Sequence, residues 1–216
     1  QRGADHLLGR TRTRPDPGDR RESLVTVALP AGPAPAPRRQ LLVGTTLAGV
    51  AVVMLIGGMS TLWLRVRDGV VSAGERFPVD YIIPEVATNV MLMTIGALCL
   101  FAQWAVYSAR RGDRAHTGLA LGVVLVMGIA VINAQAFVYS QMGMPLAETA
   151  YATLFYAITG TMTAVVIGGL ALTVVAAFRS LGGRDREFEI VSAHALLWYF
   201  IAAAYAVVWF VVYVTK

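Results

Sequence analysis

The chain has 216 residues, of which 56% are hydrophobic and 14% are charged. A soluble globular domain is about 45–50% apolar and about 25% charged, so this composition excludes that class. A single cysteine and the lack of a sequence repeat exclude disulfide-rich and collagen-like proteins. The formal net charge of +5 would suit a nucleic-acid partner. We instead interpret the arginines as signals that orient a membrane protein, and we expect no nucleic acid to bind.

Residues 1–38 are polar and rich in Arg, and then rich in Pro and Ala. Each Pro fixes its own φ and disfavours helix at the residue before it, so an extended tail is expected. The segment has no apolar run with a small-residue cleavage site, so we do not interpret it as a signal peptide. The tail is expected to dock on a partner protein through Arg12, Arg14, Arg20, Arg21, Pro33, Pro35 and Pro37.

Five apolar runs follow the tail, and none of them contains Asp, Glu, Lys or Arg. Each run exceeds the ~20 residues that a helix needs to cross ~30 Å of hydrocarbon. The sequence therefore predicts an all-α membrane domain over residues 39–216. Its five transmembrane helices are expected at about 41–64, 86–107, 117–139, 150–178 and 190–214.

The basic residues are divided unevenly between the two sides of these runs. Eight arginines precede the first run, and three lie in each of the connections between runs two and three and between runs four and five. The other side carries three arginines and Lys216. Since cytoplasmic loops carry the excess of Lys and Arg, we predict a cytoplasmic N-terminus and an outer C-terminus. The long outer connection at residues 65–85 is either a docking surface or a solvated loop.

The sequence carries no H-E-x-x-H, C-x-x-C, P-loop or G-x-S-x-G motif. We therefore expect no catalytic residue, metal or bound cofactor in this chain. Cys99 lies inside an apolar run and is expected to act as a small buried hydrophobe. A haem between helices would need a histidine deep in the membrane, whereas His194 lies near the predicted cytoplasmic face. A polar cap or an interhelical hydrogen bond is the favoured role for His194.

The polar side chains within the runs are uncharged, whereas an ion transporter normally carries an acid or a base at mid-membrane. Four of them are expected to form hydrogen bonds between helices: Asn133, Gln135, Thr159 and His194. Small residues that would allow helices to approach closely occur at Gly57, Gly58, Gly118, Gly122, Gly168 and Gly169.

Several segments together carry a resemblance to a known family. The second run leads into WAVYSARRGDR, the third closes with NAQAFVY, and the fourth opens with YATLFYAITG. Before the last run stands Glu189, followed within the run by Trp198 and Tyr205. From residue 83 onward, the chain resembles subunit III of the haem–copper oxidases, the cytochrome c oxidase family. Five spans match the family's short bacterial form, of an actinobacterium-like kind.

The chain departs from that family at several polar positions. The family usually has His-x-x-His after the Thr-Gly of the fourth run, where this chain has Met162 and Val165. The family's last helix carries a His and an Asp where this chain has Tyr199 and Ala202, and the first run here lacks the family's buried Glu. These differences bear on proton uptake and polar networks, while helix number and topology are unchanged.

The resemblance implies a non-catalytic subunit that packs against the catalytic subunit I of a terminal oxidase and stabilises it. Haem and copper would lie in partner subunits, and cytochrome c oxidation coupled to oxygen reduction would belong to the whole complex. Phospholipid would bind in a cleft between a pair formed by the first two helices and the other three. Its phosphates would meet Arg110, Arg111 and Arg114, beside Trp104. Membership in a supercomplex with a cytochrome bc complex stays open.

Two other functions remain open on the sequence alone. A helper subunit of nitric oxide reductase would have similar helices, and the missing polar residues keep that reading alive. A stand-alone small transporter or channel would need a polar path through the bundle, against which the charge-free runs argue. The haem types in the particle that contains the chain would separate these functions.

Overall fold

The computed structural model describes residues 39–75, 82–146, 149–182 and 187–215. The predicted tail, residues 1–38, lies outside the described residues, so its extended conformation stays a prediction. The same holds for its proposed docking residues, which are Arg12, Arg14, Arg20, Arg21, Pro33, Pro35 and Pro37.

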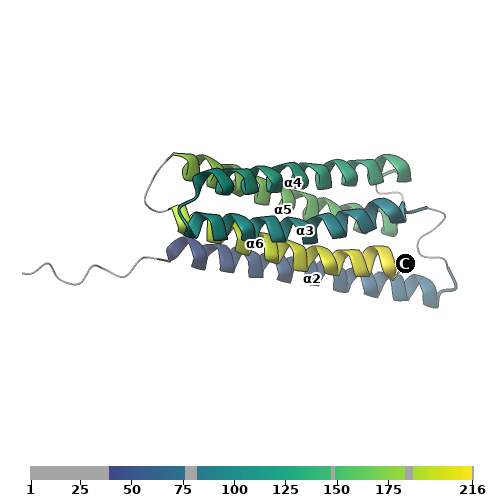
Figure 1. Cartoon of the computed structure of the whole chain (residues 1–216). Coiled ribbons are helices and arrows are strands. Elements are labelled where there is room, and N and C mark those ends of the chain that lie inside the picture. Colours follow the sequence, from purple (N-terminus) through teal and green to yellow (C-terminus); the bar gives the residue numbers. More distant parts are fainter. Residues whose placement is uncertain (1–38, 76–81, 147–148, 183–186, 216) are drawn as a thin grey trace, which may run out of the picture. The chain divides into compact units, whose positions relative to one another are not determined.

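Five long α-helices and a closing π-helix form the described part of the chain. They are α2 (Gln40–Ser72), α3 (Glu85–Arg110), α4 (Arg114–Met142), α5 (Ala150–Leu181), α6 (Glu187–Val208) and η1 (Trp209–Val214). Counting η1 with α6, all five are long and apolar enough to cross a membrane. The predicted all-α fold with five membrane-spanning helices is confirmed. Consecutive helices run in opposite directions, with their connections at the two ends of the bundle (Figure 1).

The ends of α4 and α5 follow from local sequence. Asp113 is the N-cap of α4, where its Oδ1 accepts a hydrogen bond from the backbone N–H of His116 at 3.1 Å. Thr149 caps α5 in the same way, through Oγ1 and the N–H of Ala152 at 3.1 Å. Gly143 ends α4 in the left-handed region, at φ 51°, a conformation that glycine adopts without steric cost.

Helix α2 continues beyond the end predicted for it at about residue 64. Val66 and Val70, four residues apart, lie partly buried against the hydrophobic core. Arg65 and Asp68 occupy the exposed side of the same turns. The apolar face therefore continues past the first charges, and the connection predicted at 65–85 is helical as far as Ser72.

Helix α6 lies at the centre of the packing and contacts α2, α3 and α5, while α4 packs on α3 and α5. α2 and α4 lie on opposite sides of the bundle (Figure 1). Within the described chain, α2 and α3 do not pack against each other along their length, because both pack on α6. The expectation that the first two helices form a pair beside a cleft is therefore wrong, since the described parts of α2 and α3 form no such pair.

Glycines explain two of these close contacts. A Cβ at Gly49 of α2 would collide with the ring of Phe200 on α6, so only glycine lets these two helices meet there. Trp198 of α6 lies over Gly128 of α4 and Gly169 of α5, with indole carbons 3.4 and 3.3 Å from where the two Cβ atoms would be. Short side chains thus allow close packing around the central helix.

The predicted small-residue contacts are right at one position and wrong at others. Gly169 is a contact point, as expected. Apart from the adjoining turns of the same helix, no described atom would lie within 4 Å of a Cβ at Gly57, Gly58, Gly122 or Gly168. These four glycines lie on helix faces that are turned away from the neighbouring helices. The expectation of close helix approach is corrected there.

Candidate functional site

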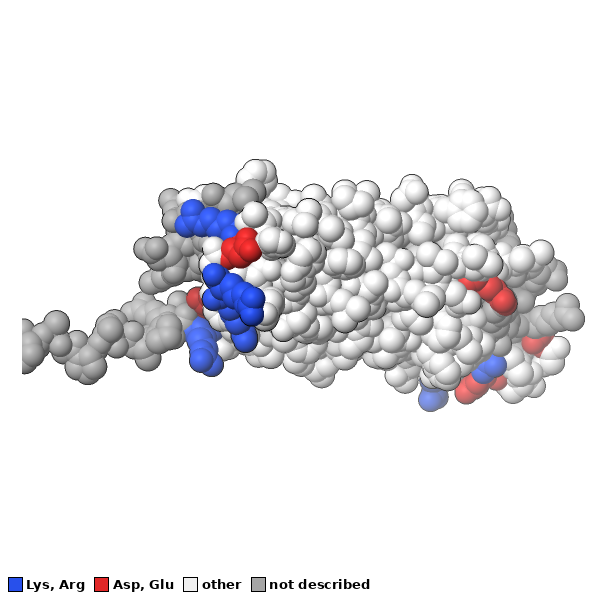
Figure 2. Space-filling view, viewed as in Figure 1, with Lys and Arg blue, Asp and Glu red and all other residues white. Residues whose placement is uncertain are grey.

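Charged side chains gather at the two ends of the bundle, and the middle of the face in view carries none (Figure 2). Five of the described arginines belong to one end, which we call the arginine end: Arg39 before α2, Arg110, Arg111 and Arg114 around the α3–α4 turn, and Arg179 in the last turn of α5. The opposite end carries charges of both signs in the last turns of α2 and at the start of α3. This distribution is the expected one for a bundle that spans a membrane.

The guanidinium groups at the α3–α4 turn are stacked on aromatic rings. The Cζ of Arg110 lies 5.0 Å from the ring centroid of Phe188, and the Cζ of Arg111 lies 4.4 Å from that of Tyr107. Within the residues that the structure describes, no carboxylate forms an ion pair with either arginine. A guanidinium that stacks through its face keeps its in-plane N–H groups available for an anion.

Trp104 lies half-buried between the arginine end and the apolar middle. Its ring centroid is 6.1 Å from that of Phe101 and 6.2 Å from that of His116. The structure therefore brings Trp104 near the start of α4, where Arg114 is the first residue. An indole at this depth places an apolar ring with a polar N–H at the level of lipid headgroups.

Asp113 and His116 form a polar pair at the same turn. The carboxylate Oδ2 of Asp113 lies 2.6 Å from Nδ1 of His116. The hydrogen bond from the backbone N–H of His116 favours the ionised carboxylate and is the main reason why the pKa of Asp113 lies below its usual value. The hydrogen bond to the His116 side chain acts in the same direction. The turn that presents the arginines is therefore fixed by an ionised cap.

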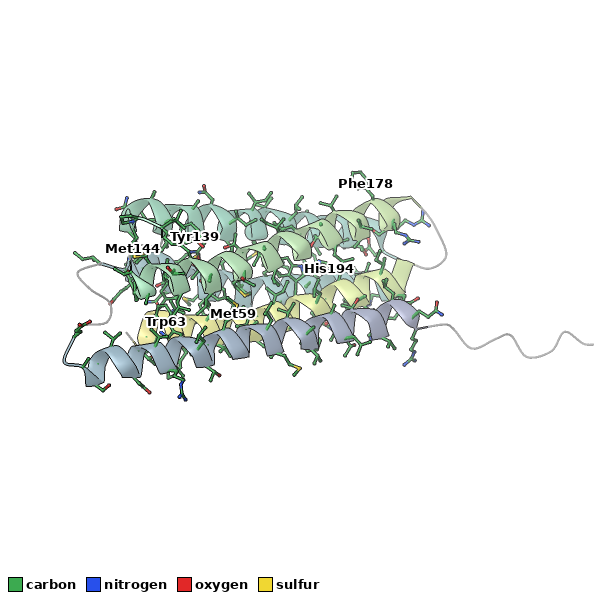
Figure 3. All side chains as sticks on the ribbon, turned by 180° about the vertical axis from the view of Figure 1, so that it is seen from behind. Met59, Trp63, Tyr139, Met144, Phe178 and His194 are labelled. Atoms are coloured by element: carbon green, nitrogen blue, oxygen red, sulfur yellow. The ribbon has the colours of Figure 1, made fainter. Side chains whose placement is uncertain are left out.

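His194 lies inside the bundle, in the half nearer the arginine end (Figure 3). Its side chain is fully buried, and its Nε2 lies 3.0 Å from Oγ1 of Thr173 on α5. The indole Nε1 of Trp198 lies 3.0 Å from the same His194 nitrogen and 3.2 Å from the Thr173 hydroxyl. These three side chains join α5 to α6. Among the described residues, no group of three or more His, Cys, Asp or Glu could hold a metal ion.

Cys99 and Trp198 connect this cluster to α3. Cys99 is buried, and its Sγ donates to the backbone carbonyl of Trp198 at 3.6 Å. The predicted burial of Cys99 is confirmed, whereas the sequence predicts no hydrogen bond for Trp198 or Thr173. The four-residue spacing of His194 and Trp198 was an available signal, because such residues share a helix face.

A second polar cluster lies between α4, α5 and the end of α6. The hydroxyl of Tyr213 donates to Oε1 of Gln135 at 3.4 Å. The hydroxyl of Tyr139 donates to Oγ1 of Thr159 at 2.9 Å, and Thr159 itself donates to the carbonyl of Phe155. Tyr139 lies in the half of the bundle away from the arginine end (Figure 3). The structure thus places Gln135 and Thr159 in bonds between elements.

Asn133 does not take the role that was expected for it. Its side chain is exposed on the outer face of α4, and no hydrogen bond joins it to a described residue of another helix. Two residues of helix rotate a side chain by about 200°, so Asn133 and Gln135 point to opposite sides. Because Gln135 faces inward, Asn133 faces outward, and the expected interhelical bond is corrected.

Three of the positions where the chain departs from the resembled family carry apolar side chains, and the fourth carries a tyrosine that forms a hydrogen bond. Met162 is buried between α4, α5 and α6, and Val165 and Ala202 are partly buried. Tyr199 donates from its hydroxyl to Oε1 of Gln103 on α3, at 2.9 Å. A tyrosine therefore connects α6 to α3 at one of these positions.

An open pocket lies at the end of the bundle away from the arginine end. Its volume is about 330 Å³, and its lining residues include Glu85, Asn89, Trp209 and Tyr213. The indole of Trp209 donates to Oδ1 of Asn89 at 2.9 Å, which ties η1 to α3.

Neutral hydrogen bonds join the helices in the interior of the bundle, and the arginines offer N–H donors to an anion at one end.

Comparison with known proteins agrees with the resemblance found in the sequence. The family model for cytochrome c oxidase subunit III matches residues 78–216. The cytochrome c oxidase subunit 3 of Bos taurus is 29% identical over 140 residues, which is 62% of this chain and 49% of the relative. That of Strongylocentrotus purpuratus is 27% identical over 133 residues, with the same shares covered.

The chain thus spans about half the length of the curated relatives that it matches. The family model covers α3, α4, α5, α6 and η1, whereas α2 precedes the matched residues. The matched part includes the arginines of the α3–α4 turn, the His194 cluster and the Gln135 cluster. With this match over most of its length and with five membrane-spanning helices, the chain belongs to the cytochrome c oxidase subunit III family.

Proposed function

We propose that the chain is a non-catalytic subunit of a respiratory terminal oxidase, which couples cytochrome c oxidation to oxygen reduction. Haem and copper would be held by partner subunits, with catalytic subunit I as the principal partner. The observation that carries this proposal is the family membership. It is supported by α2, which exposes large apolar side chains such as Leu47 and Met54. A partner subunit or lipid would cover that face.

Phospholipid is the ligand proposed for the arginine end. Arg110 and Arg111 stack on rings and keep N–H donors free, and Arg114 lies one turn away at the start of α4. Three arginines around one turn, with Trp104 against His116 in the first turn of α4, suit a phosphate at headgroup level. Replacing Arg110, Arg111 and Arg114 together with Gln should reduce the phospholipid that copurifies with the chain. The matched control is Arg65→Gln with Arg67→Gln at the opposite end, and equal losses in both variants would reject the assignment.

The arginine end is proposed to face the cytoplasm of a bacterium, with the C-terminus on the outer side. Five described arginines lie at this end, against Arg65 and Arg67 at the other. Cysteines introduced at exposed Tyr107 and at exposed Leu146 report on the two ends. In intact cells, an impermeant thiol reagent should label Leu146→Cys and not Tyr107→Cys. The reverse pattern would invert the orientation.

The tail is proposed to dock on a neighbouring subunit through Arg12, Arg14, Arg20, Arg21, Pro33, Pro35 and Pro37. Deleting residues 1–38 should weaken copurification with the oxidase while the chain itself remains in the membrane. An unchanged yield of the oxidase would reject this part of the proposal.

The decisive experiment is to solubilise native membranes mildly, capture the full chain and record the reduced-minus-oxidised visible spectrum. An a-type haem band together with copper is expected. Additional b- and c-type bands in fixed ratio would extend the proposal to a supercomplex with a cytochrome bc complex. A spectrum of b- and c-type haems alone would replace the oxidase by nitric oxide reductase. A colourless particle would overturn the oxidase assignment altogether.

A further inference from the structure

Two buried polar atoms lie without a protein partner between α4, α5 and α6. They are Nε2 of Gln135 and the hydroxyl oxygen of Tyr205, neither of which has a hydrogen-bond partner among the described residues. The two side chains are only 5% and 3% exposed. A buried donor that makes no hydrogen bond forfeits the bonds that it would make in water. Both groups therefore call for a partner that is not a protein atom.

Both residues line one and the same cavity. Its other polar lining residues are Thr159, Thr163 and Tyr213. The cavity has about 10 Å³ of room for the centre of a water molecule. That is close to the smallest space that holds one water, and it is too little for a lipid headgroup or an organic molecule. Size and polarity together select the ligand.

We propose that this cavity is a binding site for a single water molecule. The water oxygen accepts one hydrogen bond from Nε2 of Gln135 and one from the hydroxyl of Tyr205. Its own hydrogens have hydroxyl oxygens of the cavity wall as acceptors, those of Thr159, Thr163 and Tyr213. The site then offers the two to four polar partners that a buried water requires.

The water would connect two helices that meet at few points, such as Trp198 of α6 against Gly128 of α4. α4 packs on α3 and α5, whereas α6 packs on α2, α3 and α5. A water between Gln135 of α4 and Tyr205 of α6 adds a link across the bundle. Tyr213 lines both this cavity and the open pocket that includes Glu85 and Asn89. A movement of this one side chain would let the bound water exchange with the aqueous end of the bundle.

The test is Tyr205→Phe in the full-length chain, purified in detergent and followed by thermal unfolding. With the water bound, removing the hydroxyl takes away one of its partners, and Tm should fall by about 2–4 °C. Without it, the substitution removes an unpaired buried hydroxyl, and Tm should stay or rise. Tyr107→Phe is the matched control, because the Tyr107 side chain is 51% exposed, and its Tm should not change.

A second variant tests the bridge itself. In a Gln135→Leu background, Tyr205→Phe should lower Tm by less than half of its effect in the unmodified chain, since the shared water is already lost. Additive effects, or a Tm raised by Tyr205→Phe, would overturn the proposal. A high-resolution cryo-EM map of the particle that contains the chain gives a direct readout. Density for a water within hydrogen-bond distance of both atoms is expected, and its absence from a map that resolves other buried waters would refute the site.

Discussion

Helices α6 and α2 are equally apolar and yet differ sharply in how they pack. In the most apolar stretch of 18 residues, 44% of the residues are buried for α6 with η1, against 11% for α2. α6 packs mainly on three other helices, whereas α2 lies at the margin and packs mainly on α6. In a membrane, lipid is as apolar as a leucine side chain, so hydrophobicity does not decide which helix is central.

What separates the two helices is the residues that make directional or close contacts. α6 carries His194 and Trp198, which bond to α5, and Tyr199, which bonds to α3. The inward face of α2 has Gly49 and the fully buried Trp63, and Trp63 lies 5.1 Å from the ring of Tyr151. Met59 and Trp63 mark the side of α2 near the other helices (Figure 3). The bundle is therefore organised by a few small, aromatic and hydrogen-bonding residues.

The largest effect is expected from Trp198→Ala in the central helix. Trp198 is fully buried over two glycines, so truncation should leave a cavity and cost about 3–5 kcal/mol of unfolding free energy. Met54→Ala in α2 is the control, because the Met54 side chain is 72% exposed, and it should change stability by less than about 0.5 kcal/mol. Thermal unfolding in detergent compares them, and similar losses would remove the distinction between a central and a marginal helix.

The next effect concerns the seam between the two helices. Gly49→Ile would drive a side chain into the ring of Phe200 and should cost about 1–3 kcal/mol. A Cβ at Gly58, on the same helix, would meet no described atom outside its own helical turns within 4 Å, so Gly58→Ile should be tolerated. Both substitutions change helix propensity equally, so their difference in Tm isolates the packing. A Gly49→Ile variant as stable as the Gly58→Ile variant would show that α2 does not pack here.

A smaller effect is expected at the first turn of α2. The backbone N–H of Leu41 donates to Oε1 of Glu189 at 3.1 Å, so α2 is capped by a residue near the start of α6. Glu189→Ala should cost about 0.5–1 kcal/mol and should speed hydrogen exchange of the Leu41 amide. Glu189→Gln keeps an acceptor oxygen and should retain part of the protection. Unchanged exchange in Glu189→Ala would mean that the two helices are not linked there.

The smallest effect on stability is expected at the N-cap of α4. Asp113 directly precedes that helix, whereas the first turn of α2 is capped from α6. The pKa of Asp113 is lowered in the folded chain, chiefly by the backbone N–H of His116. The stabilisation by its carboxylate is therefore complete above the unfolded pKa of about 3.9 and is lost as pH falls through the folded pKa. Asp113→Asn caps without titrating. The Tm difference between the two proteins should shrink as the pH falls below about 5. A difference that does not depend on pH would show that the carboxylate is not the stabilising form.

The number and type of helices could be predicted from sequence, because length and absence of charge suffice for a membrane span. The predicted end of α2 is wrong, because the first charge, Arg65, does not end the helix. Val66 and Val70 continue its packed face. The grouping of Arg110, Arg111 and Arg114 follows from their closeness in the chain, and it too was visible beforehand.

The partners inside the bundle could not be predicted in the same way. His194 was expected to bond to another helix, but choosing Thr173 requires knowing which faces of α5 and α6 meet. Uniformly apolar helices give no such information, because every face is compatible with lipid. From sequence, Gly58 is as plausible a contact between helices as Gly49. Of these two glycines, Gly49 alone packs closely against another helix.

The π-helical end of the chain sets the angular register of its last aromatic residues. In an uninterrupted α-helix, Tyr205 and Tyr213 would be offset by roughly 80° around the axis, because eight residues advance by about 100° each. The wider turn of η1, with the N–H of Thr215 bonded to the carbonyl of Phe210, rotates less per residue and closes that gap. Both tyrosines then line the same cavity. If the same residues continued as an α-helix, Tyr213 would turn by roughly 80° away from Tyr205 and its hydroxyl would leave Gln135. The wide turn is therefore itself a determinant of the site.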